Sequence, residues 1–330
     1  MNQPRISVLL PSYNSGDTLG DAIASVLAQS FGDFELLVLD DGSAQPASAP
    51  SDPRIAVLRS DRNLGLSRQL NLGIDRARGE FIARLDADDI AHPQRFEQQL
   101  AFLLDHPEIG ICGSQAQLFD AGGEREIWDY PTSPQECHAT LFLRSCFLHP
   151  GVMIRTSILR EYGLRYDESY AVAQDYELWF RLLEVTRGAN LPACLTSYRV
   201  SDSQLTRAHS ETKTRETRQI RERLLGRLGV GGLDLYERIL SDEWEESATF
   251  YAEVAGWLNK VQAANNLFPE PAFGRLLAEM FFARCQCASR RGFDGLAAYQ
   301  QLDFARHFRS GPAARWRMRV KSILKPALTS

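Results

Sequence analysis

The sequence lacks several features that mark other classes of protein. It has no stretch that approaches the roughly 20 consecutive apolar residues of a membrane-spanning helix. Its formal net charge of -5 gives no basic excess, so nucleic acid is not expected as a partner. Its 6 cysteines are scattered over 330 residues, which argues against a disulfide framework and predicts reduced thiols. The opening residues MNQPRISVLL contain no signal-peptide core, so we expect a cytoplasmic location.

Two phosphate-binding motifs are also missing. The chain contains neither a G-x-G-x-x-G fingerprint nor a Walker loop, which weakens the case for dinucleotide binding and for NTP hydrolysis. What is present is the composition of a globular protein, with 44% hydrophobic and 24% charged residues. A chain of 330 residues is long enough for one large domain with an appendage, or for two domains.

Strand and helix patterns alternate along most of the first 200 residues. Residues 6–10 and 34–39 have the pattern of buried strands, and Asp17 or Thr18 can cap a helix between them. This order predicts a parallel pair with a right-handed crossover, and hence an α/β fold with a mostly parallel central sheet flanked by helices. Further strands are expected at residues 55–59, from residue 81, and at residues 109–118, 152–154 and 194–200. Further helices are expected at residues 66–77, 93–105, 135–142 and 176–186, and residues 120–134 are polar and rich in turn formers.

The character of the sequence changes beyond residue 201. Residues 207–325 show almost only the helical spacing of apolar residues, so we predict one domain at residues 1–205 and a helical region at residues 206–330. The last stretch mixes apolar residues with cations, which suits a helix lying on an anionic membrane; a solvated helix or a partner contact fits equally well. The cations of this basic tail are Arg309, Arg315, Arg317, Arg319, Lys321 and Lys325.

Three carboxylates follow the strand expected from residue 81. Asp86, Asp88 and Asp89 are hard oxygen donors of the kind that Mg²⁺ or Mn²⁺ binds. Like charges this close raise one another's pKa unless a cation compensates, which favours a divalent metal with an anionic ligand beyond it. The alternative is a solvated turn in which Asp89 only caps the next helix. Because the cluster ends a strand in the same sheet as the Asp40 loop, we favour the metal site.

Two other loops are expected at the same edge of the sheet. Ligands of parallel sheets lie beyond the carboxyl ends of the strands. Pro11, Tyr13 and Asn14 follow one such strand, and Asp40 and Asp41 follow the next. One of these aspartates could accept a hydrogen bond from the imide N–H of a uracil-type base, with the other near the ribose or the metal. The alternative is ordinary turn chemistry, since Asp-Gly is a common turn pair.

A further carboxylate, Asp175, introduces an amphipathic helix. It could be the N-cap of that helix, or it could act as a general base that accepts a proton from an alcohol. We place Gln174, Trp179 and His149 on the side of the acceptor or the diphosphate. A lone histidine is more often structural, so His149 has only a supporting role here. Two cations that could balance carboxylates or phosphates, or could be solvated, are Arg68 and Arg84.

The sequence resembles the family 2 glycosyltransferases, which have the GT-A fold. The matching segments include LLPSYNSGDT and LLVLDDGS, then NLGLSRQLNLGIDRARGEFIARLDADDI, and finally AVAQDYELWF. The matched segments span residues 6 to about 200, so the helical remainder lies outside the resemblance.

The resemblance implies a role for each carboxylate. Asp41 would contact the base of a nucleotide-sugar donor. Asp86 and Asp88 would form the D-x-D motif that binds the ribose and a Mn²⁺ or Mg²⁺ ion, and Asp175 would be the general base. The donor-binding residues would then be Pro11, Tyr13, Asn14, Asp40, Asp41, Arg68, Asp86, Ala87 and Asp88.

The implied function is an inverting, metal-dependent transfer of one sugar, with a UDP-sugar as the expected donor, to a hydroxyl of a glycan or lipid-linked acceptor. Such enzymes commonly serve lipopolysaccharide, capsule or exopolysaccharide assembly, and the basic tail would suit work at the cytoplasmic face of the inner membrane. Many members have an acid where this chain has Gln174, which puts a second carboxylate there in doubt. The Q-x-x-R-W signature of processive synthases is missing, which favours single-sugar transfer. The alternative is a non-catalytic nucleotide-sugar-binding or scaffold protein, although all the metal and base carboxylates are present.

Overall fold

The computed structural model describes residues 3–200, 210–241, 244, 247–289, 299 and 301–304. It divides into two compact units, the first formed by residues 1–137 and 145–216 and the second by residues 138–144 and 217–330. The boundary that the sequence predicts between residues 205 and 206 lies outside the described residues, as does the basic tail, so both stay predictions.

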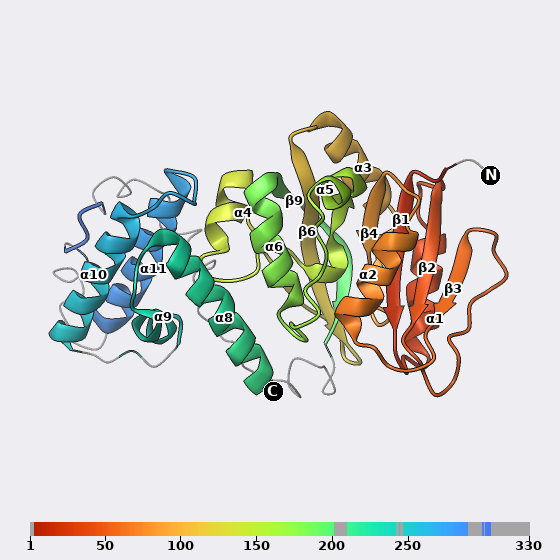
Figure 1. Cartoon of the computed structure of the whole chain (residues 1–330), viewed down its shortest axis with the longest axis horizontal. Helices are drawn as coiled ribbons and strands as arrows, with labels where there is room; N and C mark the ends of the chain where they lie inside the picture. The colour runs from red at the N-terminus through yellow and green to blue at the C-terminus, as the bar shows by residue number, and fades with distance from the viewer. Residues whose placement is uncertain are drawn as a thin grey trace. The chain divides into compact units, whose positions relative to one another are not determined.

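The first unit is built on a nine-stranded sheet. Its strands are β1 (Ile6–Ser12), β2 (Phe34–Asp40), β3 (Ile55–Arg59), β4 (Phe81–Arg84), β5 (Ile90–Ala91), β6 (Ile109–Asp120), β7 (Gly123–Trp128), β8 (Met153–Arg155) and β9 (Arg187–Arg199). They are ordered β3-β2-β1-β4-β8-β6-β9-β5, and β7 pairs with β6. The pairs β1–β2, β1–β4, β2–β3 and β6–β9 are parallel and contain most of the paired residues. The pairs β4–β8, β5–β9, β6–β7 and β6–β8 are antiparallel and short. The expected α/β fold with a mostly parallel central sheet is therefore confirmed (Figure 1).

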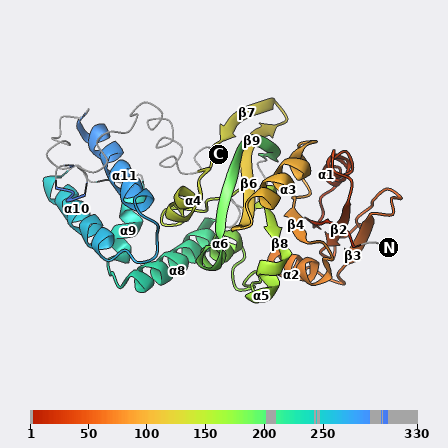
Figure 2. The same cartoon turned by 90° about the horizontal axis from the view of Figure 1, so that it is seen from above.

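Helices cover both faces of this sheet because its strands are apolar on both sides. On one face, α1 (Thr18–Leu27) and α3 (Arg95–Asp105) pack against alternate residues of β1, Ile6, Val8 and Leu10. On the other face, α2 (Leu66–Arg76), α5 (Thr156–Glu161) and α6 (Gln174–Val185) pack near Leu9 and Ile82. Figure 2 shows α1 and α3 on one side of the sheet and α2 and α5 on the other.

The structure adds elements that the sequence pattern does not predict. Residues 120–134, expected to be turns, contain β7, an exposed strand that pairs with β6. Strand β9 begins at Arg187, well before the expected residue 194. Its first half contains Gly188, Asn190 and Pro192, which strands disfavour, and its pairing register shifts between Leu191 and Cys194. Tertiary pairing with β6 overrides the weak local preference. Helix α5 is also new, and is too short to show a helical period.

The second unit is helical and has an aromatic core. Its helices are α9 (Leu233–Leu240), α10 (Ala248–Ala263) and α11 (Ala272–Ser289), and α8 (Ser210–Leu228) belongs to it from Thr217 onward. Phe142 stacks on Tyr236 at 4.7 Å between ring centroids and meets Phe273 edge-on at 5.2 Å. The helical character predicted for this region is confirmed in its described part. Among the described residues, no helix is both long and apolar enough to cross a membrane.

Candidate active site

Three loops that follow β1, β2 and β4 meet at one edge of the sheet, because these strands are parallel neighbours. The Asp41 N–H donates to the Ser12 carbonyl at 2.9 Å, which joins the first two loops. Asn14, in a left-handed conformation at φ 50, donates its N–H to Ser43 Oγ and accepts from the Ala44 N–H, both at 2.9 Å. The predicted convergence of these loops is confirmed. Within it, the two hydrogen bonds of Asn14 join the first loop to the second.

Asp40 holds the loop after β2 together. Its carboxylate is 0% exposed and accepts the N–H groups of Ser43 and Ala47, each at 3.0 Å. Burial alone would raise the pKa of Asp40, but these hydrogen bonds and the nearby Arg59 guanidinium outweigh it and lower the pKa. Asp40 therefore remains ionised as an internal anchor of the loop, and a direct contact with a donor stays a prediction.

Asp41 connects β2 to the start of α2. Its Oδ1 accepts from the Leu64 N–H and from Gln69 Nε2, each at 2.7 Å, and its Oδ2 accepts from the Gly65 N–H at 2.9 Å. A carboxylate offers about four acceptor positions, so about one is left on Oδ2. The predicted contact with a base is compatible with this arrangement, and stays a prediction.

The acidic cluster follows β4. One carboxylate oxygen from each of Asp86, Asp88 and Asp89 lies within 4.8 Å of the others. Both Nη atoms of Arg84, a buried residue, donate to Asp86. On the other side, Arg199 donates its backbone N–H to Asp89 Oδ1 and its Nε to the Asp88 carbonyl, both at 2.8 Å. Two arginines from different strands thus fix the shape of the cluster.

The nearby arginines do not fully balance the negative charge of the acidic cluster. Burial and the neighbouring Asp86 raise the pKa of Asp88, and burial, Asp86 and Asp88 raise that of the fully buried Asp89. Asp89 Oδ2 is buried and has no hydrogen-bond partner. Unpartnered carboxylate oxygen beside two more carboxylates suits a hard divalent cation, so these residues fit Mg²⁺ or Mn²⁺.

The interpretation of Asp89 as a helix cap is wrong. The N-cap position of α3 is occupied by Gln94, and no side chain caps it. Asp89 is instead 0% exposed and accepts the Arg199 N–H, so its carboxylate ties β9 to the loop after β4. The short strand β5 separates it from the helix, which the sequence pattern does not predict.

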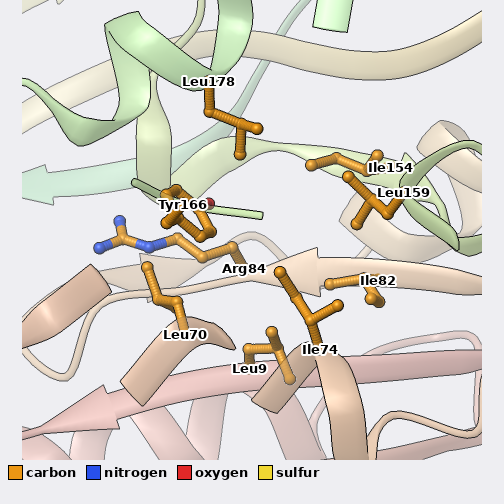
Figure 3. A pocket seen from close by; sticks show the side chains of 9 residues that line it. All are labelled: Leu9, Leu70, Ile74, Ile82, Arg84, Ile154, Leu159, Tyr166 and Leu178. Carbon is orange, nitrogen blue, oxygen red and sulfur yellow. The ribbon is translucent and has the colours of Figure 1, made fainter. Parts of the chain in front are cut away.

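Arg84 lies between the acidic cluster and the other candidate residues. Its side chain points to the α2 face of the sheet, where it lines a small cavity of about 10 Å³ together with Tyr166. That volume can hold one water molecule at most, so this cavity is not a sugar site. Figure 3 shows Arg84 and Tyr166 next to each other among apolar side chains. The Tyr166 hydroxyl in turn lies 2.8 Å from His149 Nε2.

Asp175 lies in the first turn of α6. The N-cap of this helix is Ala173, so the alternative that Asp175 is the N-cap is wrong. Asp175 Oδ2 accepts from Ser145 Oγ at 3.2 Å. Burial raises the pKa of Asp175, opposed by hydrogen bonds from the Tyr176 N–H and Ser145 and by the charges of Arg84 and Lys213. A partly exposed carboxyl with a raised pKa is suited to accepting a proton.

The other predicted residues of the acceptor side lie around the same helix. Trp179 is 0% exposed and meets His149 edge-on at 5.9 Å, so it supports the site from within the core. Burial and then the Arg84 charge lower the pKa of His149, which therefore stays neutral. Gln174 is buried, and its Oε1 has no hydrogen-bond partner. Contacts of these side chains with a ligand stay predictions.

The remaining predicted donor residues differ in exposure. Tyr13 is 51% exposed at the tip of the first loop, whereas Pro11 is buried within β1. Arg68 is exposed near the start of α2, and Ala87 is 6% exposed within the D-x-D motif. Tyr13 and Arg68 are the accessible members of this set.

Three residues of the site were missed by sequence reasoning. Arg199 reaches the acidic cluster from β9, and Glu216 accepts hydrogen bonds just before α6. Arg95 is fully buried and donates to the carbonyls of Arg84, Pro150 and Val152. No local pattern marks them, since each partner lies on another element.

Comparisons with known sequences identify relatives of this chain. A family model described as glycosyl transferase family 2 matches residues 7–163. An uncharacterized glycosyltransferase of Haemophilus influenzae is 30% identical over 258 residues, which is 71% of this chain and 77% of the relative. EpsE of Bacillus subtilis, a relative that is named as a glycosyltransferase, is 33% identical over 205 residues, 59% of this chain and 73% of the relative. The amylovoran biosynthesis glycosyltransferase AmsE of Erwinia amylovora is 28% identical over 208 residues, 60% of this chain and 77% of the relative.

Solved structures share the fold. TarS 1-349 of S. aureus in complex with UDP-GlcNAc gives a TM-score of 0.54 at 16% identity, covering 92% of both chains. The mannosyltransferase PcManGT of Pyrobaculum calidifontis, in complex with GDP-Man and Mn²⁺, gives a TM-score of 0.51 at 15% identity, covering 98% of this chain and 86% of that one. These structures show that the fold is the GT-A fold. The relatives named glycosyltransferases define the class of enzyme. The family model and the Haemophilus influenzae relative show that the chain belongs to glycosyl transferase family 2.

Proposed function

We propose that this glycosyltransferase moves one sugar from a nucleoside-diphosphate sugar to an acceptor hydroxyl, with inversion at the anomeric carbon. The observation that carries the proposal is the presence of two separate carboxylate sites. The acidic cluster contains a buried oxygen without a partner, whereas Asp175 lies on α6 and contacts Ser145. One site can hold a cation while the other accepts a proton, as a single displacement requires.

The residues would divide the chemistry between them. Asp86 and Asp88 would hold a Mg²⁺ or Mn²⁺ ion, which when bound stabilises the negative charge of the departing nucleoside diphosphate. Asp175 takes the proton of the acceptor hydroxyl as that oxygen forms its bond to the anomeric carbon. The bond from this carbon to the diphosphate oxygen breaks in the same step, and the electron pair leaves with the diphosphate. The raised pKa of Asp175 makes it a better proton acceptor once it is ionised.

We infer a UDP-sugar as the donor. TarS binds UDP-GlcNAc, which supports uridine, while the GDP-Man of PcManGT makes guanosine the competing nucleotide. In this chain, Asp41 has about one acceptor position left for the imide N–H of uracil, and Tyr13 is exposed beside the same loop. Comparing UDP with GDP by calorimetry decides between the two.

We infer that the acceptor is a glycan or a lipid-linked glycan precursor. The product would be a surface polysaccharide, namely lipopolysaccharide, capsule or exopolysaccharide. The support is the name of AmsE, an amylovoran biosynthesis enzyme. Peripheral contact of the basic tail with the cytoplasmic face of the inner membrane belongs to the same proposal, and this tail lies outside the described residues. Transfer of radiolabelled sugar to lipid extracts tests the acceptor class.

Two variants test the chemistry. Asp175→Asn should retain UDP binding in the presence of Mn²⁺ but lose transfer by about 10³-fold, because the amide cannot take a proton. Asp88→Ala should weaken Mn²⁺-dependent UDP binding, measured by calorimetry with and without chelator. Asp105→Asn, an exposed change at the C-terminal end of α3, is the matched control and should alter neither quantity.

The competing function is a non-catalytic nucleotide-sugar-binding protein. It predicts UDP binding without any sugar transfer or donor hydrolysis, whichever sugar is supplied. Undiminished transfer by Asp175→Asn would show that the base is assigned to the wrong residue. If Asp88→Ala binds UDP with an unchanged dependence on Mn²⁺, the metal site is assigned to the wrong residues.

A further inference from the structure

The segment just before α6 is held by a carboxylate from a distant helix. Glu216 Oε1 accepts the Ala171 N–H, and its Oε2 accepts the N–H groups of Val172 and Ala173, all at 2.9 Å. Glu216 is 1% exposed and lies on α8, in the part of that helix that belongs to the first unit. A region that the sequence assigns to the C-terminal helical part therefore contributes to the catalytic unit.

These three N–H groups are consecutive and form a small anion-binding arrangement. Successive backbone N–H groups that point at one place favour a negative charge, and the N-terminus of α6 adds its own partial positive charge. Glu216 satisfies this site with both of its oxygens. A neutral side chain of the same size would leave N–H groups without an acceptor, and a shorter acid would reach them less well.

Other bonds connect the same segment to α2. Ser67 Oγ donates to the Tyr170 carbonyl at 2.9 Å. Asn71 Nδ2 donates to the Tyr166 carbonyl, and Asn71 Oδ1 accepts the Tyr166 N–H, both at 2.9 Å. Residues 166–173 are thus tied to α2 at one end and to Glu216 at the other. The first helical bond of α6, from the Glu177 N–H to the Ala173 carbonyl at 3.0 Å, begins at the residue that Glu216 holds.

We propose that Glu216 is a positioning residue for Asp175. By holding residues 171–173, it fixes where α6 begins and therefore where the Asp175 carboxylate is presented to the acceptor hydroxyl. Lys213 lies one turn earlier on α8, and its charge is close enough to lower the pKa of Asp175. Helix α8 therefore also affects the protonation of the base directly, through this charge. The inference rests on the proposed role of Asp175 as the base.

The test is a comparison of Glu216→Gln and Glu216→Asp with the wild type. UDP titration in the presence of Mn²⁺ gives the concentration of donor-binding sites, and kcat is expressed per site. Glu216→Gln should lower this kcat by about 10- to 100-fold, because misplacing a catalytic group by about 1 Å has effects of that size. The KM for the donor should change by less than about threefold. Glu216→Asp keeps the charge and should recover part of the loss.

The matched control is Glu211→Gln, which removes an exposed carboxylate from the same helix and should leave kcat unchanged. If kcat per UDP-binding site is unchanged in Glu216→Gln, the residue is merely structural and the proposal is overturned. If that variant does not fold, an unchanged kcat per site in Glu216→Asp overturns it equally. Two other readings in the same assay separate the failures: if Asp175→Asn keeps full transfer, the base is assigned to the wrong residue and the premise of the Glu216 proposal fails, whereas if the wild type binds UDP but transfers no sugar, the proposed function itself fails.

Discussion

Replacing Asp41 by asparagine tests whether this residue serves the fold alone or also the donor. Asp41 is 5% exposed, and its carboxylate accepts two hydrogen bonds at Oδ1 and one, from the Gly65 N–H, at Oδ2. Asparagine has the same shape but only one acceptor oxygen, while its NH₂ group is a donor. The least costly orientation places the oxygen at Oδ1 and turns the NH₂ group toward Gly65.

The hydrogen bonds of Asp41 allow an estimate of how much stability and how much UDP affinity Asp41→Asn should lose. One hydrogen bond to a charged acceptor is lost, and such bonds contribute about 1.5–3 kcal/mol, so the free energy of unfolding should fall by about 2 kcal/mol. The remaining acceptor position on Oδ2 is also replaced by a donor. If that position binds the imide of the base, UDP affinity should fall by about 10- to 100-fold, or roughly 1.4–2.7 kcal/mol.

Urea unfolding measures the first effect, and calorimetry with UDP and Mn²⁺ measures the second. The control is Glu35→Gln at the opposite end of β2, which disturbs a buried carboxylate bonded to Ser7 at 2.6 Å and to Arg78 Nε at 2.8 Å. Glu35→Gln should be destabilised to a similar extent and bind UDP normally. If Asp41→Asn loses stability but retains full UDP affinity, Asp41 only holds the loop. Unchanged stability would refute the assignment of these hydrogen bonds.

Two further predictions concern Asp175 and Arg95. Because burial raises the pKa of Asp175, kcat should rise with pH through a pKa above the ordinary carboxyl range, measured as an acid limb that Asp175→Asn abolishes. The folded state also binds this proton more tightly than the unfolded state, so stability falls as pH rises through that window, and Asp175→Asn should be more stable than the wild type at neutral pH. Arg95→Met should lower the free energy of unfolding by about 3 kcal/mol in urea titrations, because the carbonyls of Arg84, Pro150 and Val152 each lose a hydrogen bond from the buried guanidinium.

The acidic cluster shows how far local reasoning extends. The order of strand and carboxylates in FIARLDADD predicted that Asp86, Asp88 and Asp89 lie at a strand end, and the structure brings them within 4.8 Å. The alternative that the sequence leaves open for Asp89 is a helix cap, because Asp89 lies a few residues before a helix. Its actual partner is the N–H of Arg199, and nothing near Asp89 in the sequence identifies that partner.

Pairing between distant strands explains the other differences. Strand β9 contains glycine and proline and yet runs from Arg187 to Arg199, because its long parallel pairing with β6 supplies hydrogen bonds that local preference cannot predict. In the same way, β7 forms from a polar stretch because β6 extends far enough to pair with it.

The α/β alternation can be predicted from the amino-acid sequence, and so can the loops after β1, β2 and β4 and the carboxylates that those loops and α6 carry. These features depend on apolar periodicity and on residues a few positions apart, both of which can be read along the chain. Which of those carboxylates form hydrogen bonds within the protein depends on how distant elements pack in the folded chain. In the structure, Asp40 and Asp41 accept hydrogen bonds from backbone N–H groups of loops, and one oxygen of Asp89 has no hydrogen-bond partner. Glu216 of α8 bonds to the segment at the start of α6. Each of these outcomes depends on contacts between elements far apart in sequence, where hydrogen-bond geometry rather than residue type decides the partner.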